Sequence, residues 1–106
     1  MAHNPKEILQ ENSHDIIVYT KSNCVQCKST TRRLDKAGVP YVTVGLEQDA
    51  EAFDYVMNEL GHKQAPVVVA SIRGRVRDWS GFNPAMLDEA IESATDERYV
   101  VNTLND

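Results

Sequence analysis

The segment around the two cysteines, residues 15–27, reads Asp-Ile-Ile-Val-Tyr-Thr-Lys-Ser-Asn-Cys-Val-Gln-Cys. Its first six residues are mostly apolar and β-branched, which predicts a buried strand that ends at Thr20. A short polar loop follows, and a helix is expected from about Cys24 to Ala37, with Gly38 as its C-terminal stop. The two cysteines therefore lie at a strand-to-helix junction.

This position gives the two thiols different expected roles. Cys24 falls at the N-cap or first position of the helix, where free backbone N–H groups and the helix dipole favour a thiolate. Lys21 and Lys28 add positive charge nearby, which has the same effect. Cys27 lies one turn further on the same face and is predicted to be more shielded. The hypothesis is that Cys24 is the exposed nucleophile that attacks a partner disulfide, and that Cys27 resolves the mixed disulfide.

The rest of the chain predicts one α/β domain. Strands are expected at 41–44, 67–70 and 75–79, and helices at about 50–60 and 84–94. Because the first two crossovers are long and helical, the strands they join should be parallel, in a mixed four-stranded sheet with helices on both faces. The domain should span residues 14–94. Residues 1–13 are expected to be a flexible lead-in, at most helical near Glu7–Leu9, and residues 95–106 a tail without assignment.

Composition and charge limit the classes of partner that this protein is expected to bind. The 106 residues carry a net charge of −5, which argues against nucleic acid or an anionic membrane. Residues 21–36 nevertheless carry five bases and one acid, so the field around the cysteines is positive. Nothing at the N-terminus is typical of a signal peptide, and the apolar runs are too short to span a membrane. A cytoplasmic monomer is expected.

Two further segments allow more than one interpretation. Pro66 either simply opens a strand or forms a cis bond that presents the Ala65 backbone to an incoming peptide. Residues 79–82, Trp-Ser-Gly-Phe, either pack in the core or line an apolar docking surface beside the thiols. The docking interpretation is favoured because Gly81 allows close backbone approach.

Three segments taken together resemble the NrdH redoxins, which are glutaredoxin-like in sequence and thioredoxin-like in behaviour. They are residues 18–27, Val-Tyr-Thr-Lys-Ser-Asn-Cys-Val-Gln-Cys; residues 64–68, Gln-Ala-Pro-Val-Val; and residues 79–82, Trp-Ser-Gly-Phe. The match spans about residues 15–94. It implies a thioredoxin fold, βαβαββα, with sheet order 2-1-3-4, three helices and a cis-proline at Pro66.

The resemblance also implies an activity. Thioredoxin reductase, drawing on NADPH, would reduce the Cys24–Cys27 disulfide, and the dithiol would pass electrons to a class Ib ribonucleotide reductase for deoxyribonucleotide synthesis. No cofactor beyond the disulfide is expected. The residues expected to meet partners are Lys21, Val25, Gln26, Ala65, Pro66, Trp79, Ser80, Gly81 and Phe82.

Other functions stay open. Glutaredoxins usually have Pro-Tyr between the cysteines and a Gly-Gly-Ser/Cys-Asp segment that binds the charged amino-acid end of glutathione. Here Val25-Gln26 and Phe82-Asn83 replace these, no carboxylate pairs with the ammonium, and glutathione use should be poor. A glutathione-dependent glutaredoxin is nevertheless the first alternative. A zinc or iron–sulfur module is the second, although tetrahedral zinc needs four ligands. A redox-sensing interaction module is the third.

Overall fold

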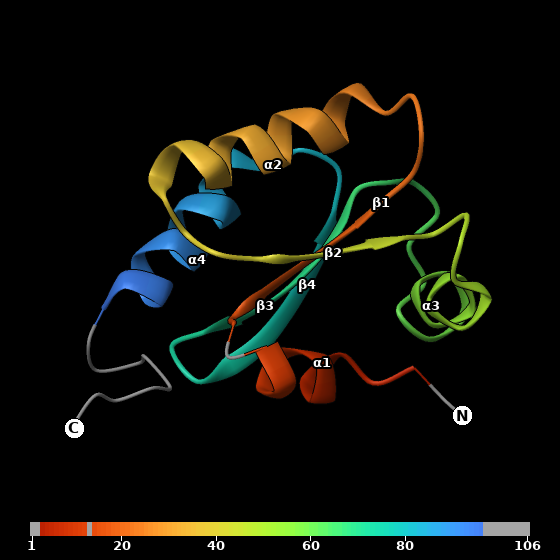
Figure 1. Cartoon of the computed structure of the whole chain (residues 1–106), viewed down its shortest axis with the longest axis horizontal. Coiled ribbons are helices and arrows are strands. Elements are labelled where there is room, and N and C mark those ends of the chain that lie inside the picture. Colours follow the sequence, from red (N-terminus) through yellow and green to blue (C-terminus); the bar gives the residue numbers. More distant parts are fainter. Residues whose placement is uncertain (1–2, 13, 97–106) are drawn as a thin grey trace.

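The computed structural model describes residues 3–12 and 14–96 and has an α/β architecture built on one sheet (Figure 1). The helices are α1 (Pro5–Asn12), α2 (Val25–Ala37), α3 (Ala50–Asp54), a π-helical turn η1 (Tyr55–Glu59) and α4 (Pro84–Thr95). The strands are β1 (Ile16–Thr20), β2 (Val42–Gly45), β3 (Val67–Ile72) and β4 (Arg75–Ser80). The sheet order is β2-β1-β3-β4, with β1 parallel to β2 and the other pairs antiparallel. The predicted thioredoxin fold and sheet order are confirmed.

Strand β1 is buried on both faces of the sheet. Ile16 and Val18 belong to one core, and Ile17 and Tyr19 to the other, since successive side chains of a strand point to opposite faces. All four are fully buried. This explains why the segment before the cysteines reads as an unbroken apolar run and not as an alternating one.

Helices cover each face of the sheet. Helices α2 and α4 lie together on one side, where Leu34 and Leu87 pack against the sheet (Figure 1). On the opposite side, Ala52 and Val56 from α3 and η1 join Leu9 of α1 against β1 and β3. Because α2 starts directly after β1, this layering holds its N-terminus, and with it Cys24, at one end of the sheet.

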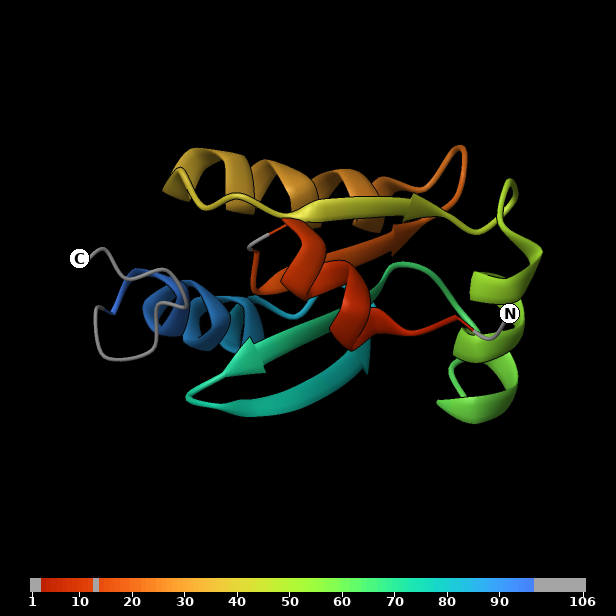
Figure 2. The same cartoon turned by 60° about the horizontal axis from the view of Figure 1, so that its bottom comes forward.

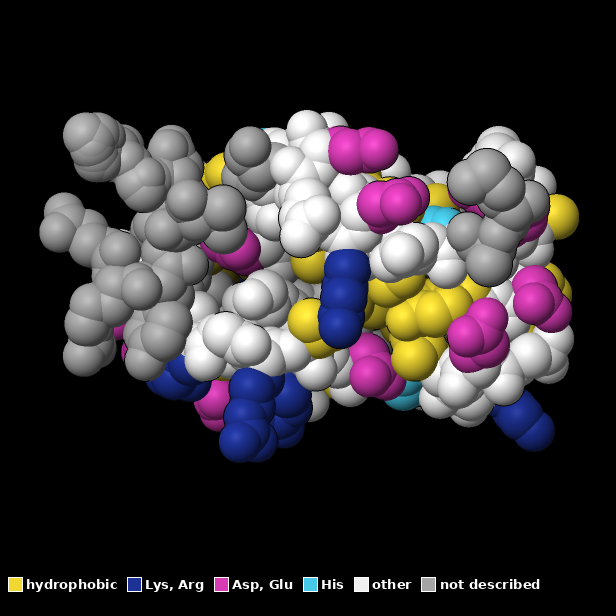
Figure 3. Space-filling model, turned by 90° about the horizontal axis from the view of Figure 1, so that it is seen from below, with side chains coloured by type: hydrophobic (Ala, Val, Ile, Leu, Met, Phe, Trp, Pro, Cys, Tyr) yellow, Lys and Arg dark blue, Asp and Glu magenta, His cyan; other side chains and the backbone are white. Residues whose placement is uncertain are grey.

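Helix α1 was not predicted as an element, so the structure has one more helix than expected. Its start is capped by Asn4, whose Oδ1 accepts hydrogen bonds from the backbone N–H groups of Lys6 (3.0 Å) and Glu7 (3.3 Å). Leu9 is buried in the core on this face. Figure 2 shows α1 lying across the sheet, and Figure 3, from the same side, shows hydrophobic side chains still partly uncovered beside charged ones. The lead-in is therefore, over residues 5–12, a packed part of the domain.

Smaller differences concern where elements end. The helix expected over 50–60 consists of the five-residue α-helix α3 followed by the five-residue π-helical turn η1. Strand β3 runs two residues beyond Ala70, to a turn at Arg73 and Gly74, which both have positive φ as a two-residue type I′ hairpin requires. The tail expected over 95–106 lies almost entirely outside the described residues. Within the described ranges, no helix combines the length and apolar character needed to cross a membrane.

Candidate active site

The cysteine pair lies at the start of α2. Cys24 is the N-cap residue, and its Sγ accepts a hydrogen bond from the Cys27 backbone N–H at 3.1 Å. The two sulfur atoms are joined in a disulfide, with the Cα atoms 5.2 Å apart. Cys24 is 8% exposed and Cys27 4%, so both residues are buried in the disulfide form. The prediction that Cys24 is exposed is therefore wrong, although Cys27 is the more shielded of the two. An N-cap sulfur that accepts a backbone N–H is placed where negative charge is stabilised, by that N–H and by the helix dipole.

The loop before Cys24 is anchored by a residue that the sequence did not single out. Glu47, which follows β2, accepts hydrogen bonds at Oε1 from the Ser22 backbone N–H (3.0 Å) and from the Ser22 hydroxyl (2.8 Å). These bonds, first from the hydroxyl and then from the backbone, together with nearby Lys21, lower the pKa of Glu47 from its ordinary value. Two loops 25 residues apart in sequence are thereby joined beside the active site.

This contact predicts a pH-dependent stability effect. A carboxylate with a lowered pKa in the folded protein stabilises it above the unfolded-state pKa, near 4.5 for Glu47, and loses that effect as the pH falls through the folded-state value. Glu47→Ala should therefore lower Tm slightly at pH 7, and the difference from the unmodified protein should shrink below about pH 4.5. Thermal unfolding followed by circular dichroism between pH 3 and 7 measures this. A Tm difference that is constant across the range would contradict it.

A cis-proline directly precedes β3 and contacts the loop after β4. The Ala65–Pro66 peptide bond is cis, and the Pro66 carbonyl accepts a hydrogen bond from the Gly81 N–H at 2.8 Å. This bond joins the start of β3 to the loop after β4. Of the two interpretations of Pro66, the structure has the cis form, and Ala65 lines a surface groove next to it.

The segment Trp79–Phe82 is divided between core and surface. Trp79 is 7% exposed and packs in the core with Leu87, so the expectation that it lines a docking surface is wrong for this residue. Its Nε1 is buried without a hydrogen-bond partner among the described residues. Ser80 is half-buried and Gly81 is buried. Phe82, in contrast, is 37% exposed and remains available for contact.

The two residues between the cysteines, Val25 and Gln26, have different surroundings. Val25 is 78% exposed. Gln26 turns toward the loop after β4, and its Oε1 accepts a hydrogen bond from the Phe82 backbone N–H at 2.8 Å. The structure thus brings together the three segments that carry the sequence resemblance: the cysteine loop, the cis-proline and the end of β4.

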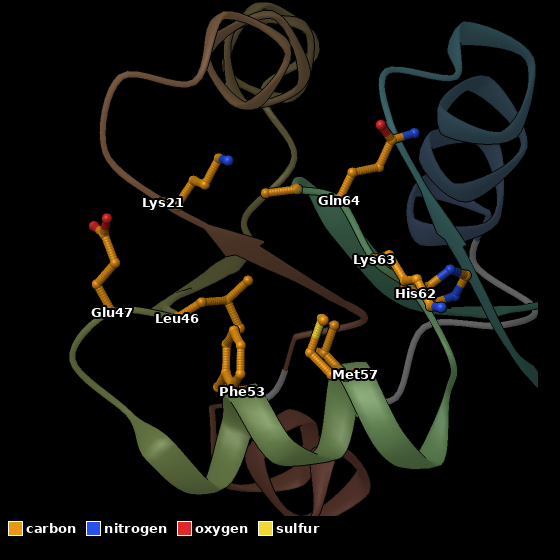
Figure 4. Close-up of a pocket in the computed structure, with 10 residues that line it drawn as sticks. Lys21, Leu46, Glu47, Phe53, Met57, His62, Lys63 and Gln64 are labelled. Carbon is orange, nitrogen blue, oxygen red and sulfur yellow. The ribbon is translucent and has the colours of Figure 1, made fainter.

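An apolar groove of about 250 Å³ opens beside the cis-proline. Figure 4 shows Phe53 and Met57 rising from the helix below it toward Lys21 and Gln64 above. Its lining residues are Lys21, Leu46, Glu47, Phe53, Val56, Met57, His62, Lys63, Gln64 and Ala65. Of these, only Lys21 and Ala65 were expected to contact a partner. The groove is formed where segments far apart in the chain meet, and no local pattern marks it.

A metal site was one alternative raised by the paired cysteines. In the part of the chain that the structure describes, no three His, Cys, Asp or Glu side chains come together in a way that could hold a metal ion. His62 instead contacts Asp78, with Nε2 2.6 Å from a carboxylate oxygen.

Comparison with known proteins agrees with this geometry. The glutaredoxin family matches residues 16–76. The glutaredoxin-like protein NrdH of Salmonella typhimurium is 36% identical over 73 residues, which cover 69% of this chain and 84% of that protein. The gene 56 protein of Mycobacterium phage L5 is 32% identical over 80 residues, covering 76% of this chain and 75% of its own.

Solved structures give the same result. The NrdH-redoxin of Escherichia coli superposes with a TM-score of 0.61 at 33% identity, covering 69% of this chain and 90% of that one. A glutaredoxin from Archaeoglobus fulgidus, at 23% identity and a TM-score of 0.61, shares the fold over 76% of this chain and 89% of its own. With its cysteine pair at the N-cap of α2, the chain belongs to the glutaredoxin family, among the NrdH glutaredoxin-like proteins, and is a thiol–disulfide oxidoreductase.

Proposed function

We propose that thioredoxin reductase reduces this protein at the expense of NADPH, and that its dithiol delivers electrons to a class Ib ribonucleotide reductase. The observation that carries the proposal is the Cys24–Cys27 pair at a helix N-terminus, beside exposed apolar side chains. The related E. coli NrdH-redoxin has been described as having a thioredoxin-like activity profile, which supports it. Such a carrier would work as a monomer in the cytoplasm, where thiols are kept reduced.

The chemistry proceeds through one mixed disulfide. In the dithiol form, the Cys24 thiolate attacks one sulfur of the partner's disulfide, that S–S bond breaks, and the first partner thiol leaves. The Cys27 thiolate then attacks Sγ of Cys24 and releases the second partner thiol. The partner gains two electrons and two protons, and the Cys24–Cys27 disulfide forms. Because Cys27 is held one helical turn away, the second attack is intramolecular and fast.

A protein fits this site better than a small charged thiol. Val25 and Phe82 expose apolar surface next to the cysteines, and Phe53 is 47% exposed at the groove beside Ala65. An extended segment of a partner could pair with the Ala65 backbone and place an apolar side chain in the groove. Burial of such a side chain contributes roughly 1.5–3 kcal/mol to binding.

Phe53→Asp tests this docking surface. Because Phe53 is already half exposed, the variant should fold, but a charge in the groove should raise KM for a protein disulfide by about tenfold. Reduction of a small aromatic disulfide such as 5,5′-dithiobis(2-nitrobenzoate) should not change, and Phe53→Leu should behave as the unmodified protein. An equal loss with both substrates would mean that the groove does not dock proteins.

Comparison of two reducing systems tests the proposed function itself. NADPH oxidation is followed with insulin as the disulfide substrate, with either thioredoxin reductase or glutathione plus glutathione reductase. Turnover with the first system and little with the second is expected, and transfer to a class Ib ribonucleotide reductase is then measured directly. The reverse pattern would identify a glutathione-dependent glutaredoxin and overturn the proposal.

A further inference from the structure

We infer that the outward face of α2 is an interaction surface for a protein that this redoxin reduces and that presents carboxylates next to its disulfide. The surface is a row of three exposed cations, Lys28, Arg32 and Lys36, here called the basic ridge. The ridge begins beside Val25, which is exposed next to the cysteine pair. The inference rests on the proposed electron transfer to a protein and names the surface chemistry of the acceptor.

The helical repeat places the basic ridge on the side of α2 that faces away from the sheet. The buried residues of the helix are Cys27, Thr30 and Leu34, which therefore mark its inner side. The three ridge residues follow one another at intervals of four positions, and residues with this spacing lie above one another on one helix face. Figure 1 shows α2 as an outer layer, with its far side turned away from the sheet and from α4.

The remaining charged residues at the C-terminal half of α2 have partners, whereas the basic ridge has none. Arg33 pairs with Asp88 of α4, with Nη2 2.9 Å from a carboxylate oxygen. Asp35, the one acid of the helix, accepts a hydrogen bond from the Tyr41 hydroxyl at 2.7 Å. Among the residues that the structure describes, no ion pair or side-chain hydrogen bond involves the ridge. Its charge is therefore complementary to carboxylates that a partner supplies, in a chain whose own net charge is −5.

Distance along α2 determines the size of molecule that can use the basic ridge. At a rise of 1.5 Å per residue, Arg32 lies about 12 Å and Lys36 about 18 Å along the helix from Cys24. A small disulfide at Cys24 does not reach that far. A protein interface of about 800 Å² per partner has a radius of about 16 Å if it is circular and centred on the disulfide. A protein that reaches Cys24 therefore covers Arg32 and brings its rim to Lys36.

The basic ridge is expected to act mainly on the rate at which the acceptor associates. Exposed charges that match a partner raise association rates about tenfold or more at low ionic strength. Salt at 0.1 M screens charge interactions beyond about 10 Å, so the contribution of Arg32 and Lys36 should fall as salt is added. Val25, 78% exposed between the ridge and the disulfide, supplies apolar contact at the same interface.

Two double variants separate the position of the charge from its amount. Arg32→Glu with Lys36→Glu reverses two cations of the basic ridge and keeps Lys28, the ridge residue nearest to the thiols. Lys6→Glu with Arg75→Glu makes the same change in net charge elsewhere and is the matched control. Lys6 is exposed in α1, on the other side of the sheet, and Arg75 is exposed at the start of β4, away from the active-site loop.

The first measurement uses two peptide disulfides with about 15 residues per chain, long enough to span the ridge. One has glutamate at every fourth position after its cysteine, and the other has glutamine there. Exchange with the reduced protein is timed at about 20 mM and about 500 mM salt. The unmodified protein should react about tenfold faster with the glutamate peptide at low salt, and equally with both at high salt.

The variants decide whether the basic ridge causes this preference. The ridge variant should lose the preference for the glutamate peptide, and the control variant should keep it. The absence of a preference in the unmodified protein, or the same loss in both variants, would overturn the inference. Binding of a DNA duplex that depends on the ridge at about 0.1 M salt would assign the surface to nucleic acid instead and would also overturn it.

Reduction of 2-hydroxyethyl disulfide, which is small and uncharged, reports on the thiols themselves. Equal rates are expected for the unmodified protein and both variants. A slower rate in the ridge variant alone would mean that the substitutions act on Cys24 and not on docking, and the inference would be wrong.

An assay of the unmodified protein with thioredoxin reductase, NADPH and insulin keeps this result separate from the proposed function. If the reductase does not reduce the protein, the proposed function is wrong, but peptide exchange still tests the basic ridge because it needs no reductase. If the reductase assay succeeds and the peptide preference is absent, only the inference about the ridge fails.

Discussion

Replacing Cys24 by serine is expected to reduce disulfide exchange to the rate seen without the protein. A hydroxyl at the N-cap of α2 still accepts the Cys27 N–H, so the fold should be kept while the nucleophile is lost. Insulin reduction with thioredoxin reductase and NADPH measures the effect. Circular dichroism on the same sample checks that the helix content is unchanged.

Replacing Cys27 by serine should have a different result, and the pair of variants identifies the nucleophile. Cys24 can still attack, but nothing releases the mixed disulfide, so one equivalent of substrate should stay bound and turnover should stop. Intact-mass spectrometry detects the adduct, and mild reductant should remove it. An adduct in Cys24→Ser instead would assign the attack to Cys27. Unchanged turnover in Cys27→Ser would contradict the two-cysteine mechanism.

The largest effect on stability is expected from Leu87→Ala in α4. Leu87 is fully buried in the core that also holds Leu34 and Trp79, between α4, α2 and the sheet. Truncating such a side chain removes its transfer free energy and leaves a cavity, at a cost of about 2–5 kcal/mol. Small domains have a free energy of unfolding of about 5–15 kcal/mol, so this is a large share. Urea unfolding of the oxidised protein gives the difference.

Leu9→Ala in α1 is the matched control, since it makes the same chemical change at the margin of the domain. Leu9 is buried, but α1 is a single short helix that packs on the sheet at one end of the chain, where the surroundings can relax into the gap. A smaller loss is expected there than at Leu87. A loss under about 1 kcal/mol at Leu87 would mean that α4 is not a structural part of the core.

The N-cap residues of α4 and α1 show which helices a local sequence pattern can predict. Asn83 and Pro84 correctly predicted the start of α4, because an apolar stripe followed them. The same pair at Asn4 and Pro5 starts α1, but the residues after it are mostly polar, with Ile8 and Leu9 as the only aliphatic side chains of the helix, so no long apolar stripe marks it. Helix α1 is stabilised by the burial of Leu9 against the sheet. A tertiary contact of this kind cannot be predicted from the sequence of the helix alone.

Trp79 lies in a motif that the sequence did single out, but its burial could not be predicted. From the sequence, an aromatic next to Ser-Gly-Phe suits a docking loop as well as a core, because both environments favour large apolar side chains. The structure buries Trp79 and leaves Phe82 exposed, since Trp79 is still in β4 and points to the α2–α4 side, whereas Phe82 lies past the end of the strand. The side on which a residue lies depends on where the strand ends, which a pattern predicts only to within a few residues.

The sequence alone determined the order of the elements after α1, the buried strand β1 and the cysteine pair at the following helix N-terminus. These features depend on residues close together in the chain, where periodicity, caps and turns act. Only the tertiary structure decided how Glu47 holds Ser22, how Gln26 meets Phe82 and where the groove at Phe53 opens. Such contacts join residues 25 or 56 positions apart. They arise when the layers pack around the sheet, and no local preference of either partner encodes them.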